Sequence, residues 1–369
     1  MNMKTGQKLD GNAVVYCEGF YNTTYGKTAH GLVRFTQRYH VLSVVDSRYS
    51  GQDAGQVLDN KPNNIPIVAS VEEAVKAAKA AGTPATHMVI GIAPDGGVLT
   101  PLARQNVLAA IRLGLNIDSG LHHYLSEDRE MFETAAQFNV QLRDVRKQPP
   151  KEKLHFFSGK IEKVNALKIA LLGTDSAVGK RTTAWLLVHG LIDAGYKAEM
   201  VGTGQTAWMQ GAKYSIILDT TVNDFLAGEI EHAAWSAWDE NHPDVIVIEG
   251  QGSMMNPAYP GGYEILAAGR PDLVILQHAP ARKDYDGFPG YPIHPLSRQI
   301  QAVEFVCGKP VAAITLNHEG LLPEQIPPLC EAIRQVTGLP ALDPLLSGGK
   351  ELVKALQPYL DKWIRREKK

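Results

Sequence analysis

The sequence has few cysteines, no excess of either charge and no long apolar run. Its three cysteines, Cys17, Cys307 and Cys330, show neither metal-site spacing nor a paired disulfide framework, so we expect buried thiols. Thirty-seven Lys and Arg residues against 39 Asp and Glu give a net charge of −2, and no basic surplus indicates a nucleic-acid partner. With no signal-peptide pattern and no membrane-length apolar run, we expect a cytoplasmic protein that acts on a small molecule.

The length predicts two domains. A chain of 369 residues exceeds the size that one hydrophobic core usually serves. Residues 148–153 read Gln-Pro-Pro-Lys-Glu-Lys, and a stretch so rich in proline and charge is typical of a linker. We therefore predict one domain over residues 1–150 and a second over residues 151–369.

The first domain alternates short apolar runs with helical patterns. This alternation predicts an α/β fold with a doubly wound parallel sheet, in which ligands bind at the carboxyl ends of the strands. His122 and His123 follow the last run, and imidazole suits proton transfer near neutral pH, so both are candidate bases. The alternative is that they only cap a loop. The apolar runs lie at residues 13–16, 40–45, 65–68, 87–92 and 115–118.

The second domain opens with a phosphate-loop pattern. An apolar run at residues 167–172 predicts a buried strand, and a helical pattern follows the loop that comes after it. In this layout the loop N–H groups and the helix N-terminus face an anion, and a lysine adds positive charge. A structural glycine-rich turn is the alternative. The candidate phosphate-binding residues are Gly173, Thr174, Asp175, Ser176, Ala177, Val178, Gly179, Lys180, Arg181, Thr182 and Thr183.

Two departures from the usual phosphate loop bear on metal binding. Five residues rather than four separate Gly173 from Gly179, and Arg181 stands where a magnesium-binding serine or threonine is usual. Thr182 comes one position later, rotated by about 100° around the helix axis. If magnesium binds, Thr182 and Glu249 are the expected ligands.

Glu249 carries the second chemical signal of this domain. Four β-branched residues at positions 245–248 predict a buried central strand, which delivers Glu249 into a Gly-Gln-Gly turn. The strand, the glycine turn and the phosphate loop together predict a P-loop domain with a parallel sheet. A catalytic role for Glu249 is the alternative to metal support. Further strands are expected at residues 198–201, 216–219, 273–277 and 311–316.

Polar residues after these later strands are candidates for catalysis and substrate binding. His278 follows the strand at residues 273–277 and is a third candidate base. The irregular residues 279–295 contain Arg282 and Tyr285. Because long irregular segments in compact domains are usually functional or mobile, we interpret both as substrate ligands, with a plain surface lid as the alternative.

Two more polar residues complete the candidate set. Asn317 follows the strand at residues 311–316, where an asparagine can read a nucleotide base, although a turn-forming role explains it equally well. Gln205 follows the strand at residues 198–201 and is a third substrate-binding candidate.

Several of these motifs resemble those of known families. The Gly-Thr-Asp-x-x-Val-Gly-Lys loop and the Glu-Gly-x-Gly turn resemble those of dethiobiotin synthetase and its P-loop relatives, where the glutamate supports the metal or phosphate site. The first domain resembles in layout the coenzyme A-binding Rossmann domain of succinyl-CoA synthetases. Shared features are a glycine-containing loop at residues 51–55 and a Ser-Gly-Leu that follows a late strand.

Over nearly its full length the sequence is similar to the D-glutamate/D-glutamine N-acetyltransferase family, long catalogued as a domain of unknown function. Residues 173–183, 249–252 and 119–122 carry the resemblance. It implies a Rossmann-like domain followed by a P-loop domain. It also implies acetyl transfer from acetyl-CoA to the amino group of a D-acidic amino acid or its amide.

The residues alone leave other functions open. An ATP-dependent ligase or kinase of the dethiobiotin-synthetase type would hold Mg-ATP with Lys180, Thr182 and Glu249. A nucleotide-gated regulatory protein would use ATP or GTP to switch the first domain. We expect a homo-oligomer with an amino acid substrate and with neither nucleic acid nor membrane as a partner.

Overall fold

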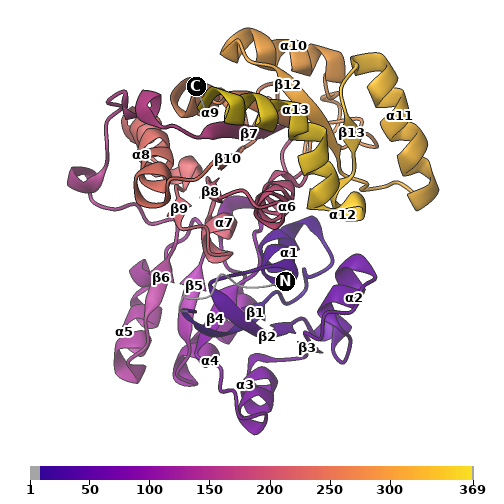
Figure 1. The fold of residues 1–369 in the computed structure, drawn as a ribbon. Coiled ribbons are helices and arrows are strands. Elements are labelled where there is room, and N and C mark those ends of the chain that lie inside the picture. The colour runs from indigo at the N-terminus through magenta and orange to yellow at the C-terminus, as the bar shows by residue number, and fades with distance from the viewer. Residues whose placement is uncertain (1–8, 368–369) are drawn as a thin grey trace. The chain divides into compact units, whose positions relative to one another are not determined.

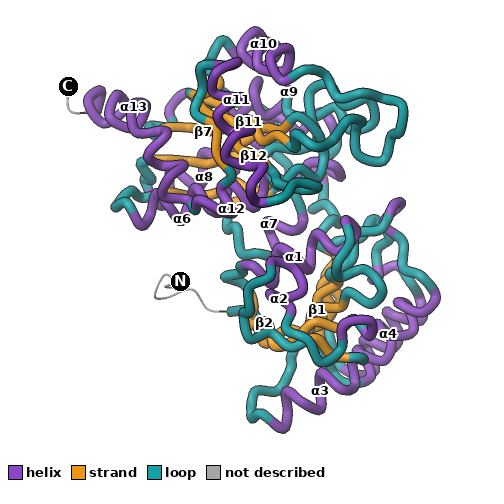
Figure 2. The backbone as a smooth tube through the Cα atoms, turned by 90° about the vertical axis from the view of Figure 1, so that its right-hand side faces the viewer, coloured by secondary structure: helices purple, strands orange, loops and turns teal. Residues whose placement is uncertain are grey.

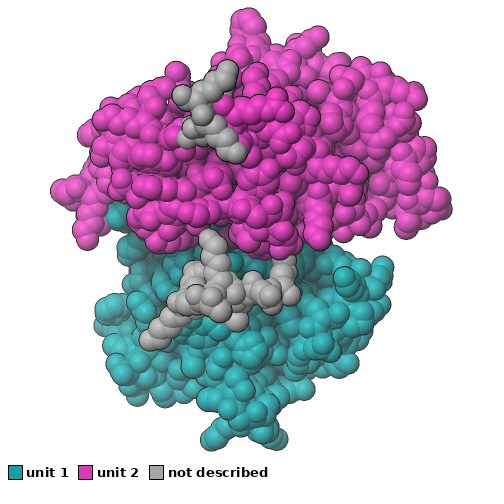
Figure 3. Space-filling view, viewed as in Figure 1, with its two compact units in different colours: residues 1–149, 205–212 teal, residues 150–204, 213–369 magenta. Residues whose placement is uncertain are grey.

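The computed structural model describes residues 9–367. The chain forms two compact units (Figure 3), namely Met1–Pro149 with Gln205–Ala212, and Pro150–Gly204 with Lys213–Lys369. Each unit is built on one sheet whose described strand pairs are all parallel, and helices flank the strands (Figure 2). Two parallel-sheet α/β domains are therefore present, and the predicted fold class is confirmed.

The sheet of the first unit has six strands in the order β3-β2-β1-β4-β5-β6 (Figure 1). The strand order reverses between β1 and β4, as in other doubly wound folds. Burial explains why β1 is central, because Ala13, Val14 and Val15 are each 0% exposed. Its strands are β1 (Gly11–Tyr16), β2 (Tyr39–Val45), β3 (Ile67–Val68), β4 (His87–Ile90), β5 (Asn116–Ser119) and β6 (Leu142–Asp144). Its helices are α1 (Lys27–Arg34), α2 (Ala54–Asp59), α3 (Val71–Ala80), α4 (Pro101–Arg112), α5 (Arg129–Phe138) and α7 (Gln205–Met209).

Helix α7 belongs to the first unit although the chain segments on both sides of it, Pro150–Gly204 and Lys213–Lys369, belong to the second. Met209 is 0% exposed and lies in the hydrophobic core of that unit. Gln210 Nε2 donates hydrogen bonds to the carbonyl oxygens of Gly31 and Phe35, at 2.8 and 2.9 Å. The predicted division at residue 150 does not include this return of the chain.

A charged network also holds α7. The guanidinium carbons of Arg38 and Arg143 lie 3.7 and 4.7 Å from the centre of the Trp208 ring. Arg143 donates to Asp118 Oδ1 at 2.6 Å, and the Tyr39 hydroxyl donates to Asp118 Oδ2 at 2.5 Å. Burial and the neighbouring Asp118 carboxylate raise the pKa of Tyr39, so this hydroxyl stays protonated.

The sheet of the second unit has seven strands in the order β13-β12-β11-β7-β10-β8-β9. The apolar runs predicted as buried strands are the central ones, and every residue of β7, β10 and β12 is buried. The strands are β7 (Leu167–Gly173), β8 (Ala198–Gly202), β9 (Tyr214–Ser215), β10 (Val245–Glu249), β11 (Leu273–His278), β12 (Val311–Leu316) and β13 (Ala341–Leu342). The helices are α6 (Lys180–Asp193), α8 (Asn223–Asn241), α9 (Tyr263–Gly269), α10 (Leu296–Cys307), α11 (Ile326–Thr337), α12 (Pro344–Ser347) and α13 (Gly349–Glu367).

One strand prediction is wrong. Residues 216–219 do not form a strand, because the sheet pairing ends with β9 and a 3-10 turn follows at Leu218–Thr220. The hydroxyls of Thr220 and Thr221 both donate to the carbonyl oxygen of Ile217, at 3.2 and 2.9 Å. Such local side-chain bonds compete with a sheet ladder and favour the turn.

The described helices contain no candidate membrane span. Within residues 9–367, no helix combines the length and the apolar character that a membrane span requires.

Candidate functional site

The loop between β7 and α6 has the geometry of a phosphate loop. Gly179 has φ +98°, which favours glycine, and Ala177 also adopts a left-handed conformation, with φ +50°. A Cβ atom added to Gly173 would lie 2.9 Å from a methyl carbon of Val178 and 3.0 Å from Lys180 Nζ. Only glycine therefore lets the lysine fold back over the end of the strand.

Lys180 is buried within this loop, with 7% of its surface exposed. Its ammonium donates to the carbonyl oxygens of Asp175 and Gly252, each at 2.7 Å. Gly252 lies in the turn after β10, so the ammonium joins the phosphate loop to the turn that follows Glu249. The position of the charge is thus fixed by backbone groups on both sides.

Asp175 is fully buried in the loop, at 0% exposed. Its Oδ1 accepts from Ser176 N at 2.7 Å and from Asn256 Nδ2 at 2.9 Å. Its Oδ2 accepts from Arg282 Nη1 and from Asp286 N, both at 2.9 Å. The carboxylate therefore joins three loops, those after β7, β10 and β11.

Glu249 lies at the end of β10 with 5% of its surface exposed. Thr203 N donates to its carboxylate at 2.9 Å. Burial raises the pKa of Glu249, against the opposing charges of Arg181 and Lys180. Among residues 9–367, no three His, Cys, Asp or Glu side chains form a metal-binding group. Magnesium binding by Thr182 and Glu249 stays a prediction.

The end of β11 places two side chains beside the loop. Gln277 Oε1 accepts from the hydroxyls of Thr183 and Thr315, at 2.7 and 2.6 Å, which connects α6 to β12. His278 Nδ1 lies 2.9 Å from Thr174 Oγ1. Burial lowers the pKa of His278 to about 4, so the imidazole is neutral at neutral pH. His278 therefore contacts the phosphate loop of its own unit.

Two further candidates lie on the loops around this site. Asn317 Nδ2 donates to the carbonyl oxygen of Val178 at 3.0 Å, and its Oδ1 accepts from Glu319 N at 2.9 Å. Tyr285 is 4% exposed, and its ring packs edge-on against His294 at 6.4 Å between centroids. The loop of residues 279–295 also has a backbone hydrogen bond of its own, from Ile293 N to the carbonyl oxygen of Lys283.

The remaining candidates belong to the first unit. His122 and His123 are exposed, and His123 N donates to the carbonyl oxygen of Gly97 at 3.1 Å. Gln205 is 8% exposed and packs over Gly120, where an added Cβ would lie 2.6 Å from Gln205 Cγ. Roles for these three residues in catalysis or substrate binding stay predictions.

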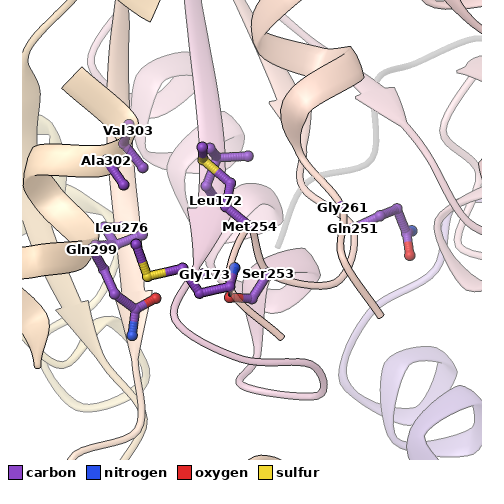
Figure 4. Close-up of a pocket in the computed structure, with 11 residues that line it drawn as sticks. Leu172, Gly173, Gln251, Ser253, Met254, Gly261, Leu276, Gln299, Ala302 and Val303 are labelled. Carbon is purple, nitrogen blue, oxygen red and sulfur yellow. Dashed lines mark hydrogen bonds between the residues drawn. The ribbon is translucent and has the colours of Figure 1, made fainter. Parts of the chain in front are cut away.

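A small pocket opens beside Gly173 (Figure 4). Its volume of about 10 Å³ corresponds to roughly one water molecule. Figure 4 shows Gln299, Ala302 and Val303 of α10 on one side and Gln251 with Gly261 on the other. The other lining residues are Leu172, Ser253, Met254, Met255 and Leu276.

Comparison with known proteins identifies the family. The model of the DUF1611 C-terminal P-loop domain, described as a domain of unknown function, matches residues 155–353, which is more than half of the chain. The chain belongs to the DUF1611 family. The DUF1611 N-terminal Rossmann-like domain matches residues 47–148.

Two curated relatives carry a printed activity. A D-glutamate N-acetyltransferase from Tritonibacter scottomollicae is 30% identical over 292 residues, which cover 77% of this chain and 84% of that protein. A D-glutamate N-acetyltransferase from a Pseudoalteromonas species is 29% identical over 281 residues, which cover 74% of this chain and 82% of that protein. The crystal structure of a DUF1611 family protein from Anabaena variabilis matches 95% of this chain and 100% of its own, with a TM-score of 0.86 and 27% identity.

Sequence reasoning missed three residues of the site. Each of Asn256, Thr203 and Gln277 bonds to a residue that was a candidate, namely Asp175, Glu249 and Thr183, yet none of the three was itself a candidate. Asn256 stands before a proline, a dipeptide that marks a turn and was the only local signal. Thr203 follows an ordinary apolar run and Gln277 ends one, and the hydrogen-bond partners of both lie far away in sequence.

Proposed function

We propose that the protein is an acetyl-CoA-dependent N-acetyltransferase that acts on the amino group of a D-acidic amino acid or its amide. The observation that carries the proposal is the similarity to two D-glutamate N-acetyltransferases, each matched over more than four-fifths of its length. This chain also matches both domains of the family, so the similarity is not limited to a common P-loop fold.

The phosphate loop supports the cofactor part of the proposal. Coenzyme A carries a pyrophosphate and a 3′-phosphate, which are anions of the kind that loop N–H groups and a lysine bind. Within residues 9–367, none of the backbone–backbone hydrogen bonds of loops and turns has the N–H group of Ala177, Val178 or Gly179 as its donor. With the Lys180 ammonium beside them, they fit a phosphate group.

The chemistry also needs a proton acceptor. Acetyl transfer forms a bond from the amine nitrogen to the acetyl carbon and breaks the thioester bond. The amine loses a proton, and the coenzyme thiolate takes one up. Acetyl-CoA supplies the activated acyl group. His278 contacts the loop through Thr174 and is neutral, so its ring can accept a proton only as a weak base, and binding of substrate would have to raise its pKa for it to act.

The proposal is tested by incubating the full chain with acetyl-CoA and one amino acid at a time. D-glutamate, D-glutamine and L-glutamate are compared, with thiol release followed by a colorimetric reagent and N-acetyl product by mass spectrometry. Lys180→Ala should weaken coenzyme A binding by about tenfold or more, because a hydrogen bond to a charged group is worth about 1.5–3 kcal/mol. Lys213→Ala, which removes an exposed lysine paired with Glu240, is the matched control.

A different result would favour the rival function. If Mg-ATP raises the melting temperature and acetyl-CoA does not, and no N-acetyl product forms, the transferase proposal fails and the ligase or kinase prediction replaces it. A ligand at 100 times its dissociation constant stabilises a protein by about 2.7 kcal/mol, which a melting curve resolves.

A further inference from the structure

Three consecutive carbonyl groups of the phosphate loop are bound from outside the loop. The Arg282 guanidinium donates to the carbonyl oxygen of Ser176 at 2.8 Å and to that of Ala177 at 3.4 Å. Asn317 Nδ2 donates to the carbonyl oxygen of Val178 at 3.0 Å. These donors come from the loops after β11 and β12, so two neighbouring strands position them.

The orientation of these carbonyls decides where the next N–H groups point. A peptide unit is planar and trans, so its C=O and N–H bonds point in opposite directions. Holding the carbonyls of residues 176–178 on one side therefore turns the N–H groups of Ala177, Val178 and Gly179 to the other side. None of these three N–H groups is the donor in a backbone–backbone hydrogen bond of the described loops and turns.

Arg282 has no donor left for a ligand. A guanidinium has five N–H donors. Its Nη1 donates to Asp175 and to Ser176 O, and its Nη2 donates to Ala177 O and to Glu319. The fifth donor, on Nε, is directed to Glu319 as well, at 3.2 Å.

Asn317 is fixed in the same way. Its Oδ1 accepts from Glu319 N, which assigns the amide orientation and leaves Nδ2 as the group that faces Val178. The backbone of Asn317 is itself held, since its N–H donates to the carbonyl oxygen of His278 at 2.8 Å. The side chain is thus set before any ligand arrives.

We propose that Arg282 and Asn317 are positioning residues that orient the peptide planes of residues 176–179, so that three N–H groups form one preorganised site for a pyrophosphate or phosphomonoester group. In this proposal Arg282 acts through the loop and not as the substrate ligand that was predicted. The left-handed conformation of Ala177, which L side chains rarely adopt, is stabilised by the same three bonds to the carbonyls of residues 176–178. This inference rests on the phosphate-binding role proposed for the loop.

Inorganic pyrophosphate is the probe, because it tests the loop without any acetyl transfer. Its dissociation constant is measured by calorimetry on the full chain and on Arg282→Lys, Asn317→Asp and Asn317→Leu. Arg282→Lys keeps the charge but loses the planar fork, and Asn317→Asp puts an acceptor opposite the Val178 carbonyl. Asn317→Leu removes the donor without adding a charge. A loss of affinity in this variant therefore reports on the orientation of the loop and not on repulsion between a new carboxylate and pyrophosphate. Arg334→Lys, at an exposed ion pair with Glu331, is the matched control.

We expect the Arg282 variant and both Asn317 variants to bind pyrophosphate about tenfold or more weakly than the wild type. The reason is the loss of one or more charge-assisted hydrogen bonds from the loop N–H groups to the anion. The control should bind within about twofold of the wild type. Hydrogen exchange of the peptide that contains residues 176–180 should slow on adding pyrophosphate in the wild type and much less in the variants. The KM for acetyl-CoA should rise while the KM for the amino acid stays unchanged, a split that general loss of structure would not give.

The outcomes separate this inference from the proposed function. If the wild type binds pyrophosphate and acetylates a D-amino acid, but the Asn317 variants bind pyrophosphate within about twofold of wild type, the positioning role is wrong and the transferase stands. If the wild type binds pyrophosphate and the variants do not, while no acetyl product forms, the positioning role stands and the transferase fails. Should Arg282→Lys not fold, the two Asn317 variants decide.

Discussion

Arg282 Nη1 lies 2.9 Å from Asp175 Oδ2, and these side chains are 12% and 0% exposed. The pair joins the phosphate loop to residues 279–295, which are more than a hundred positions away in sequence. A buried pair of this kind is costly to break because one charge is then left without its partner. The surrounding loops therefore depend on it for their conformation.

Asp175→Asn should lower the free energy of unfolding by about 3 kcal/mol, since removal of one partner of a buried pair typically costs about 3–5 kcal/mol. Urea denaturation of both proteins measures the difference. Glu133→Gln removes an exposed partner of Arg129 and should change stability by less than about 0.5 kcal/mol. A loss at Asp175 as small as that of the control would contradict the prediction.

The pH dependence of stability should report on His278. Burial lowers the pKa of His278 from 6.5 to about 4, so below pH 6.5 the unfolded chain binds the proton more readily than the folded one. The His278 contribution to stability is therefore complete above pH 6.5 and is lost as the pH falls toward 4. His278→Gln should show a shallower fall over this range in denaturant titrations. Parallel curves for the two proteins would refute this.

Substitution of Gln277 should show that a buried hydroxyl without its hydrogen-bond acceptor lowers stability more than removal of the hydroxyl does. Gln277, Thr183 and Thr315 are 2, 3 and 0% exposed. Gln277→Leu leaves two hydroxyls without their acceptor, at about 1–3 kcal/mol for each. Adding Thr183→Val and Thr315→Val should recover much of the loss, since removal of all the polar groups can be nearly neutral. A triple variant less stable than the single one would argue against this account of the cluster.

Met209 tests whether α7 is a structural part of the first unit. Its side chain is 0% exposed, so Met209→Ala should cost about 2–5 kcal/mol through the cavity it leaves. Met209→Leu, which nearly conserves volume, should cost less than about 1.5 kcal/mol. Hydrogen exchange of β1 peptides, measured beside urea denaturation, locates the effect in that unit. Equal stability of the two variants would show that the core does not need this side chain.

The parallel sheets and the phosphate loop could be predicted from the sequence because their signals are local. The β-branched run at residues 245–248 is too apolar to face solvent, and it forms the buried strand β10. The glycines of the loop mark conformations that other residues avoid, as Gly179 shows. In each case a few neighbouring residues carry the information.

The supports of the loop could not be predicted, because they join residues that are far apart. Asn256 and Asp286 reach Asp175 across 81 and 111 positions. Arg282 was predicted to bind substrate because it lies in a long irregular segment, and only the fold reveals the carbonyl groups that it meets. Helix α7 has five residues, too few for any hydrophobic period to be recognised.

The return of residues 205–212 to the first unit has a consequence for how the chain folds during synthesis. The ribosome releases the first 149 residues long before Met209, so the core of that unit lacks one of its members until more than fifty further residues have emerged. A fragment that ends at the linker should therefore expose apolar surface that the full chain covers. Excision of the first domain as an independent protein would require the segment 205–212 to be supplied as well.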